Sequence, residues 1–339
     1  MNSRNGILLQ WKKMNKVYTI AEIGVNHNGS LETAIELIKR AKDCGADAVK
    51  FQMYDTKSNY NYDITDKNII RWSSKLSLSF QDFAKIANIC KKHKIEFISS
   101  VFDQHSFLEY LKLKPKIIKI PSSEIENFQL LDQIKKTKLI TIFSNGIANI
   151  DQIKTLKKKL NKKDFYKHPK LKKPLYCLYC VSKYPTKPEE MNLDYINIIK
   201  KRCNIETGLS DHTIGTHAPI IASYLGSKII EKHFKLSNKH KCPDQEVSLG
   251  QKEFKNMIDG INIAQQLAEK NTLNIIDVDF IKKGFYMNQN LNKDIKIQKK
   301  HIVLKKPNHS DNLKLKDILG KRLKNNLKKN QAISKKDLY

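Results

Sequence analysis

Arginine is scarce in this chain of 339 residues. Nearly all of the formal net charge of +29 comes from lysine, because arginine occurs only as Arg4, Arg40, Arg71, Arg202 and Arg322. Arginine is the side chain that reads nucleic-acid bases and clamps phosphates with paired hydrogen bonds. The lysines are instead scattered over predicted helix surfaces among many Asn and Ile residues. We therefore expect no nucleic-acid partner, although the positive charge favours small anionic substrates through long-range steering.

Cysteine is also sparse, and long apolar runs are absent. Six Cys residues in a chain of this length form no dense disulfide framework, which favours a reducing, cytoplasmic environment. Cys177 and Cys180 form a C-x-x-C pattern inside an apolar run that is expected to be a strand. Residues three apart in a strand point to opposite faces, so we predict buried core thiols rather than a shared metal. No run is long enough to cross a bilayer, and residues 1–16 lack the features of a signal peptide.

Short β-branched runs alternate with amphipathic helical patterns from Val17 to about Lys270. Two of the helical patterns have plausible ends, one at Gly45 as a C-cap and one after Ser79 as an N-cap. This alternation predicts a parallel sheet, and its count is that of a (β/α)8 TIM barrel, with an open doubly wound sheet as the alternative. The predicted strands are residues 17–24, 47–53, 95–100, 116–122, 139–146, 175–182, 205–211 and 228–234.

The pattern changes near Asn271, after which short apolar runs are separated by Lys- and Asn-rich turns without a long helix. A small, mostly β module fits this part of the chain. The predicted organisation is an N-terminal extension at 1–16, the TIM barrel at 17–272, a linker at 273–280 and the small module at 281–339.

Polar residues gather at the carboxyl ends of the predicted strands, where a TIM barrel has its active site. A purely structural barrel would not need them there. They are Glu22, Asn26, His27, Lys50, Gln52, Ser99, Ser100, Lys119, Ser122, Ser123, Glu124, Ser144, Asn145, Ser182, Tyr184, Ser210, Asp211, His212, Glu231 and His233.

Lys50 and Lys119 lie inside otherwise apolar strands, where an unpaired ammonium would be costly. An anionic ligand, held also by hydroxyl groups, is their expected partner. The alternative is a rim lysine whose ammonium reaches water. Glu22 and Glu124 lie beside the expected anion site and suit proton transfer or water positioning, but either could instead pair with one of the lysines.

His212 and His233 come from adjacent predicted strands. Two imidazoles with open remaining positions suit a divalent metal that also binds substrate and water. Ordinary hydrogen-bonded histidines are the alternative. The histidines without such a partner are expected on the surface or behind the site, and they are His27, His93, His105, His217 and His240.

Several of these residues fall in motifs that closely resemble the sialic acid synthase family, and the tail resembles the antifreeze-like (SAF) domain of those enzymes. The resemblance covers about residues 17–339. The motifs are AEIGVNHNGS (21–30), GADAVKFQ (45–52), KIPSSE (119–124), CVSKYPTKPEEMNL (180–193), GLSDHTIG (208–215), EKHF (231–234) and PDQEVSL (243–249).

The resemblance implies a transferase that condenses phosphoenolpyruvate (PEP) with N-acetylmannosamine, its 6-phosphate or a related N-acetylated amino sugar. It also implies a domain-swapped homodimer and a Mn2+ or Mg2+ ion held by His212 and His233. By the same resemblance, Glu22 is an acid beside the reacting centre, with Glu124, Lys50 and Lys119 as the other catalytic groups. The resemblance places Lys50, Lys119, Ser100, Ser144, Ser182 and Ser210 around PEP, and Gln52, Glu124, Tyr184 and Asp244 around the amino sugar.

The implied mechanism begins with the metal polarising the open-chain aldehyde oxygen of the sugar. C3 of PEP attacks the aldehyde carbon, and water positioned by Glu22 or Glu124 adds to C2. The tetrahedral intermediate then loses phosphate by C–O cleavage, while Lys50 and Lys119 hold the anion.

This sequence departs from the family pattern at several positions. The largest departure is Lys306 before Pro307, where the family carries an Arg that reaches the sugar site of the partner subunit; Lys makes no bidentate contact. This puts the acyl group of the sugar in doubt. Other departures are Ser99-Ser100-Val101, Ser123, Asn145, Ser182, Cys242 and Gln245. The alternatives are a different PEP-dependent sugar aldol synthase and a nucleic-acid binder suggested by charge alone.

Overall fold

The computed structural model describes residues 17–268 and 281–339, which form two compact units on either side of residues 269–280. The predicted extension at 1–16 and linker at 273–280 lie outside the described residues, as does the end of the predicted barrel domain.

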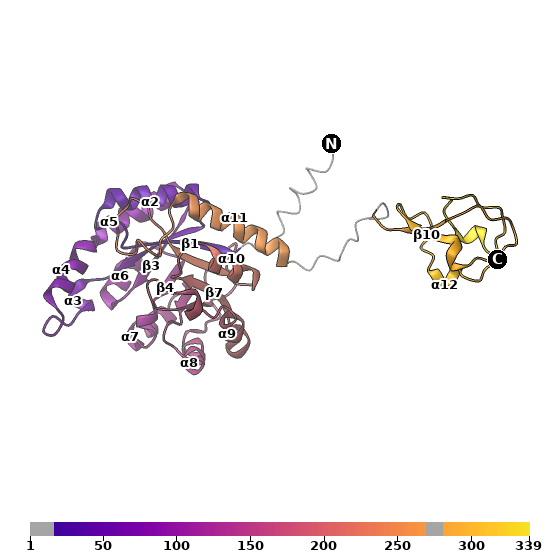
Figure 1. Ribbon diagram of the computed structural model, residues 1–339. Helices are drawn as coiled ribbons and strands as arrows, with labels where there is room; N and C mark the ends of the chain where they lie inside the picture. The colour runs from indigo at the N-terminus through magenta and orange to yellow at the C-terminus, as the bar shows by residue number, and fades with distance from the viewer. Residues whose placement is uncertain (1–16, 269–280) are drawn as a thin grey trace. The chain divides into compact units, whose positions relative to one another are not determined.

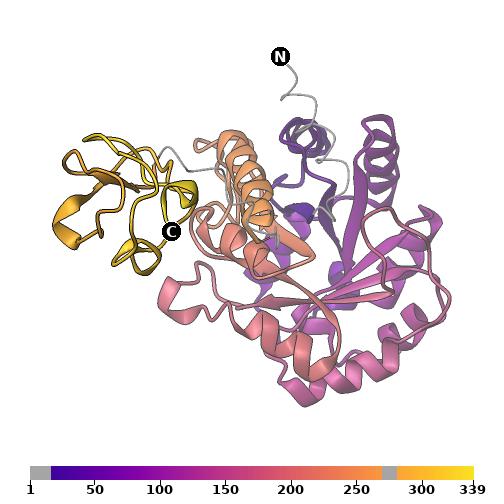
Figure 2. The same cartoon turned by 90° about the vertical axis from the view of Figure 1, so that its right-hand side faces the viewer.

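The first unit is a closed barrel of parallel strands in which each strand pairs with the next and β1 pairs with β8 (Figures 1 and 2). This confirms the predicted (β/α)8 barrel over the open sheet, and every strand ends within two residues of its predicted range. The strands are β1 Tyr18–Gly24, β2 Ala48–Met53, β3 Glu96–Val101, β4 Ile117–Ile120, β5 Ile140–Ser144, β6 Leu175–Cys180, β7 Glu206–Asp211 and β8 Ile229–His233.

Helices fill every crossover between the strands. Ser79 caps α5 as predicted, its side chain accepting from the amide of Asp82. The C-cap of α2 is Cys44 rather than Gly45, which follows it at φ +89° and reverses the chain. The helices are α2 Leu31–Asp43, α3 Thr56–Asn59, α4 Lys67–Leu76, α5 Phe80–Lys92, α6 Gln104–Lys112, α7 Phe128–Lys135, α8 Ile150–Leu160, α9 Tyr195–Cys203, α10 His217–Tyr224 and α11 Gln251–Ala268.

The strands alternate their side chains between the barrel interior and the helices, as the period of two requires. Toward the amino ends of the strands the interior is filled by a separate apolar cluster. In six strands, the position two residues beyond the last cluster residue faces the same interior and is polar; these positions are Glu22, Lys50, Ser100, Lys119, Ser144 and Glu231. The cluster contains Tyr18, Ile20, Ala48, Ile98, Ile117, Ile140, Ile142, Leu171, Tyr176, Leu178 and Ile229.

Cys177 and Cys180 are both buried, and they lie on opposite sides of β6 as predicted. Cys177 belongs to the apolar layer between the strands and the helices. The thiol of Cys180 lies 3.8 Å from Nδ1 of His212 at the carboxyl end of the barrel.

The second unit is small and consists largely of turns around its own apolar core. Its sheet is the antiparallel pair β9 Gly284–Met287 and β10 Ile302–Lys305. Isolated β-bridges connect other segments of the unit. The short helix α12, Leu315–Ile318, covers a single turn, which agrees with the prediction that no long helix occurs here. Across residues 17–268 and 281–339, no helix is long and apolar enough to span a membrane.

Candidate active site

Four charged side chains are buried together in the barrel interior, above the apolar cluster. Lys50 Nζ lies 2.8 Å from Oε2 of Glu22 and 3.8 Å from Oε1 of Glu231. Lys119 Nζ lies 3.2 Å from the same oxygen of Glu231. Each of the four residues is at most 4% exposed. We call Glu22, Lys50, Lys119 and Glu231 the charged cluster; its formal charges sum to zero.

The two carboxyl groups of the charged cluster have different proton affinities. Burial raises the pKa of Glu22, the nearby Glu231 carboxylate adds to this, and Lys50 offsets it only in part. Burial acts in the same sense on Glu231, but Lys119 and Lys50 outweigh it and lower the pKa to about 2. Glu231 is therefore a fixed anion, whereas Glu22 can take up and release a proton.

The two lysines are paired with protein carboxylates, so their burial does not by itself require an anionic ligand, and that ligand stays a prediction. The alternative of a rim lysine reaching water is wrong, because both side chains are buried. Burial lowers the pKa of Lys119, which Glu231 offsets only in part. For Lys50, the carboxylates of Glu22 and Glu231 outweigh burial and raise the pKa. Pairing with Glu22, left open from the sequence, is what occurs at Lys50.

Hydroxyl groups surround the charged cluster. Ser100 accepts a hydrogen bond from Lys50 at 3.0 Å, and Ser210 donates to Glu231 at 2.8 Å. Ser144 Oγ is buried and has no hydrogen-bond partner among the described residues. An unsatisfied buried hydroxyl is unfavourable, and a ligand oxygen would satisfy it.

Ser182 is exposed, and its hydroxyl lies 3.3 Å from that of Ser122 across the mouth of the barrel. Gly146, with φ +46°, follows β5 between them, and a Cβ there would come within 2.3 Å of Ser122 Cβ. A side chain at position 146 would therefore displace these hydroxyls, so the backbone can pass close beside them only as glycine.

His212 and His233 lie side by side at the ends of β7 and β8, with ring centroids 5.4 Å apart. Nδ1 of His212 lies 2.8 Å from the carbonyl oxygen of Val181, which can only accept, so Nδ1 carries the proton and Nε2 keeps its lone pair. Burial lowers the pKa of His212 to about 3, which keeps the ring neutral. Nδ1 of His233 lies 3.3 Å from Oδ2 of Asp244.

These two histidines suit a metal that takes its remaining ligands from substrate and water. His212 is neutral and oriented by a backbone acceptor, as metal-binding histidines usually are. Within residues 17–268 and 281–339, no group of three or more His, Cys, Asp or Glu side chains is arranged to hold a metal ion. Protein ligands would thus supply two positions and leave the others open.

A cavity of about 530 Å³ opens next to the histidine pair. The ring of Tyr184 forms one wall, with its centroid 4.0 Å from that of His212. Gln52 is not among the residues that line this cavity; its amide lies 3.5 Å from Oε1 of Glu22, at the limit of a hydrogen bond. The other wall is the loop after β8, with Cys242, Pro243, Asp244, Gln245, Glu246 and Val247.

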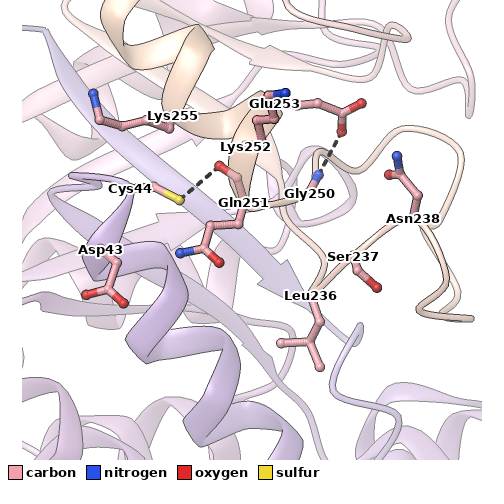
Figure 3. Close-up of a pocket in the computed structure, with 10 residues that line it drawn as sticks. All are labelled: Asp43, Cys44, Leu236, Ser237, Asn238, Gly250, Gln251, Lys252, Glu253 and Lys255. Carbon is pink, nitrogen blue, oxygen red and sulfur yellow. Dashed lines mark hydrogen bonds between the residues drawn. The ribbon is translucent and has the colours of Figure 1, made fainter.

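A larger cavity of about 610 Å³ lies between the end of α2 and the start of α11 and contains none of the predicted site residues (Figure 3). Its polar groups serve local structure: Cys44 donates to the carbonyl of Gln251, and Glu253 accepts from the amide of Gly250. We place the candidate site in the barrel because the charged cluster and the histidine pair are there.

Glu124 makes its hydrogen bonds outside the charged cluster, and Lys306 belongs to the second unit. Glu124 lies in the 3₁₀ turn Ser122–Glu124 after β4, where its carboxylate accepts from Ser123 and Asn127. The alternative that Glu124 pairs with a buried lysine is therefore wrong. Lys306 follows β10 in the second unit, so no contact between it and the barrel is described.

Two buried residues, Glu231 and His27, were assigned no functional role from the sequence. Glu231 was among the strand-end polar residues but was given no role, although its place two residues from both Ile229 and His233 indicated an inward side chain. His27 was expected on the surface or behind the site, and it is buried at 1% exposure. His105 and His217 are exposed, as expected.

The fold and this site define a class of protein: a (β/α)8-barrel enzyme with buried acid–base groups beside a pair of histidines. Residues 37–272 match the model of the NeuB family, so the chain belongs to the NeuB family.

The chain is similar along most of its length to named synthases. It is 33% identical to the pseudaminic acid synthase of Campylobacter jejuni, covering 95% of this chain and 96% of that protein. It is 31% identical to the N,N'-diacetyllegionaminic acid synthase of the same species, covering 94% and 99%. The crystal structure of the N-acetylneuraminic acid synthetase of Leptospira borgpetersenii superposes with a TM-score of 0.70 at 28% identity, covering 78% of this chain and 89% of that one.

Proposed function

We propose that this enzyme condenses PEP with an amino sugar of the N-acetylmannosamine class, releasing phosphate and forming a nonulosonic acid. The observation that carries the proposal is the charged cluster lying beside a histidine pair at the carboxyl end of the barrel. The synthases that this chain resembles are named for three such acids, so the product class is supported by several relatives.

PEP is assigned to the charged cluster and its hydroxyls. Lys50 and Lys119 offer positive charge, and the free hydroxyl of Ser144 offers a hydrogen bond that no described residue takes. An arriving trianion would further raise the pKa of Glu22, which burial already raises. The ligand would then compete with Glu22 for the ammonium of Lys50.

Glu22 is assigned the handling of the water that adds to C2 of PEP, because it is the carboxyl group of the cluster that can exchange a proton. Glu231 is assigned a different part. Its carboxylate stays charged beside Lys119 and Lys50, so it stabilises positive charge developing at C2. Both carboxylates are held by buried partners, which limits their reorganisation during the reaction.

A divalent metal, Mn2+ or Mg2+, is assigned to His212 and His233. When bound, it would polarise the aldehyde oxygen of the sugar. Asp244, next to His233, and Tyr184, against His212, lie where the sugar chain would extend from that aldehyde. Gln52 and Glu124 are assigned to the same substrate.

The sugar site is proposed to be completed in a homodimer by Lys306 of the second unit of the other protomer. The exposed Lys306 precedes Pro307 through a cis peptide bond, and its position corresponds to the arginine that the family places there. A lysine offers a single cationic point in place of a bidentate fork, so we expect weaker orientation of the acyl group.

The test is phosphate release from PEP in the presence of Mn2+ and a panel of acceptors: N-acetylmannosamine, its 6-phosphate, and the 2,4-diacetamido sugars that lead to legionaminic and pseudaminic acids. Release with one member, with a product mass equal to a nonulosonic acid, supports the proposal. Release only with arabinose 5-phosphate or erythrose 4-phosphate would assign a different aldol synthase. No release with any acceptor from a folded protein would refute the proposal.

The metal assignment has its own control. His212→Ala and His233→Ala should each abolish the dependence of activity on Mn2+ without unfolding the protein, because neither histidine belongs to the apolar cluster inside the barrel. Full activity in either variant would refute the ligand assignment.

A further inference from the structure

Asp211 and Lys232 form an ion pair that no solvent reaches. Lys232 Nζ lies 2.6 Å from Oδ2 of Asp211, and both side chains are 0% exposed. They are the last residues paired between β7 and β8 in the register of the barrel. His212 directly follows Asp211 at the end of β7, and His233 directly follows Lys232 as the last residue of β8.

The pair faces away from the barrel interior. On β8, Glu231 and His233 point inward, so Lys232 shares the outward face of Ile230. On β7, Ser210 points inward to Glu231, so Asp211 shares the face of Leu209. Leu209 and Ile230 both belong to the apolar layer between strands and helices. The ion pair therefore lies in apolar surroundings, outside the charged cluster.

Thr213 ties the pair to the chain that carries His212. Its amide donates to Oδ1 of Asp211 and its hydroxyl to Oδ2, each at 3.1 Å. Its carbonyl oxygen accepts from Lys232 Nζ. Asp211 and Thr213 flank His212 on both sides, so these contacts hold the backbone before and after the histidine to the strand that carries His233.

Net stability does not explain the pair. Two charges taken out of water recover their desolvation cost only with excellent geometry, and apolar residues of similar volume are often as stable or more so. A two-histidine metal site, in contrast, depends on the relative placement of its imidazoles to within a fraction of an ångström, because metal–nitrogen bonds are about 2.0–2.1 Å long. Apolar side chains in place of Asp211 and Lys232 would not fix the relative placement of the two imidazoles in this way.

We propose that Asp211 and Lys232 are positioning residues that hold His212 and His233 in register for one shared divalent metal. This inference rests on the proposed metal site. The ion pair joins the ends of β7 and β8, and the hydrogen bonds of Thr213 fix the backbone on both sides of His212. The distance between the two imidazoles on the opposite face of the strands is thereby fixed as well. Neither residue touches substrate or metal.

The test replaces both charges at once, in Asp211→Asn with Lys232→Met, so that no uncompensated charge is left buried. The purified variant is titrated with Mn2+ by calorimetry, and its Co2+ complex is examined by visible absorption. We expect the Kd for Mn2+ to rise about tenfold or more and the Co2+ ligand-field bands to shift. An unchanged Kd together with an unchanged Co2+ spectrum would overturn the proposal.

A partly exposed ion pair at the other end of the barrel, with side chains 27% and 22% exposed, controls for general destabilisation. Lys170 Nζ lies 2.6 Å from Oδ1 of Asp47, which precedes β2. Asp47→Asn with Lys170→Met should lower the thermal midpoint without changing the Mn2+ Kd or the Co2+ spectrum. An equal loss of metal affinity in this control would show that the effect at Asp211 and Lys232 is not positional.

Two further measurements keep the test decisive. If the double variant does not fold, Thr213→Val removes one hydrogen bond to Asp211 with little change of volume, and a rise in Kd of about threefold is expected; no rise would overturn the proposal. Wild-type binding of Mn2+ that is lost in His212→Ala shows that the metal site itself exists. Wild-type protein that binds no Mn2+ would refute the metal assignment and this proposal with it, whereas a bound metal indifferent to the pair refutes the proposal alone.

Discussion

Glu22 and Lys50 form a buried ion pair of 2.8 Å between neighbouring strands of the barrel. The same ammonium is also 3.8 Å from Glu231, which is the carboxylate that Lys119 contacts at 3.2 Å. Removing Glu22 leaves each lysine with an anion, whereas removing Glu231 leaves Lys119 without a carboxylate partner among the contacts described. The two carboxylates should therefore respond differently to mutation.

Glu231→Gln should lower the free energy of unfolding by about 3 kcal/mol, because it leaves a buried ammonium uncompensated. Glu22→Gln should cost much less stability. Urea unfolding of both variants measures the difference. Added PEP should recover part of the stability of Glu231→Gln, since its anion can replace the missing carboxylate. Equal destabilisation by the two substitutions would contradict the geometry of the cluster.

Glu22→Gln should instead lower kcat by roughly 10²-fold or more, because a group that exchanges protons is replaced by one that cannot. The pH profile of kcat should also lose the limb that reports this carboxyl group. The variant should keep its affinity for PEP. A kcat within a few-fold of wild type would assign the water-handling role elsewhere.

Ser144→Ala should raise the KM for PEP by about tenfold while leaving the protein as stable as the wild type, since the buried hydroxyl has no described partner to lose. Ser99→Ala is the matched control. Ser99 Oγ donates to the carbonyls of Phe51 and Ser100, so this variant should lose about 1 kcal/mol of stability with little change in KM. The same KM change in both variants would show that Ser144 has no special access to the substrate.

Acid should destabilise the barrel partly through His27. Burial lowers its pKa from 6.5 to about 4, so the unfolded chain binds a proton in that interval and the folded chain does not. The contribution to stability is present above pH 6.5 and is lost as the pH falls toward 4. Between pH 7 and pH 5, the wild type should lose about 2 kcal/mol more than His27→Asn.

His27→Asn is chosen because its side-chain oxygen can still accept from the amide of Gly29, as Nδ1 of His27 does at 3.1 Å. Urea unfolding at the two pH values, with both proteins free of metal, provides the measurement. Parallel pH dependences would mean that His27 does not titrate in this range.

Lys306→Arg should lower the KM for the amino sugar and leave the KM for PEP unchanged, because a guanidinium can make the two-point contact that an ammonium cannot. Steady-state kinetics at saturating concentration of the other substrate separates the two constants. Sedimentation velocity should show the same oligomeric state for both proteins. A change confined to PEP would place Lys306 at the other end of the site.

The strands could be predicted because their signal is local. Most are short apolar runs beside an amphipathic helix, as in the β-branched run Ile117–Ile120, and the alternation alone indicates a parallel barrel. Once the barrel is predicted, the polar strand-end residues must meet at one rim, since all strands run the same way. The histidine pair and the candidate lysines followed from that argument without any contact being known.

The amino-acid sequence by itself thus determined the barrel, the end of it that carries the chemistry and the residue types gathered there. Only the tertiary structure decided which charges pair. From the sequence we expected Lys50 to bind an anionic ligand, and in the structure strand register places it against Glu22. The structure also places Glu231, rather than Glu124, beside Lys119. The physical reason is that an ion pair depends on ångström distances between strands that can be more than 200 residues apart, as β1 and β8 are. Those distances are set by how the closed barrel packs.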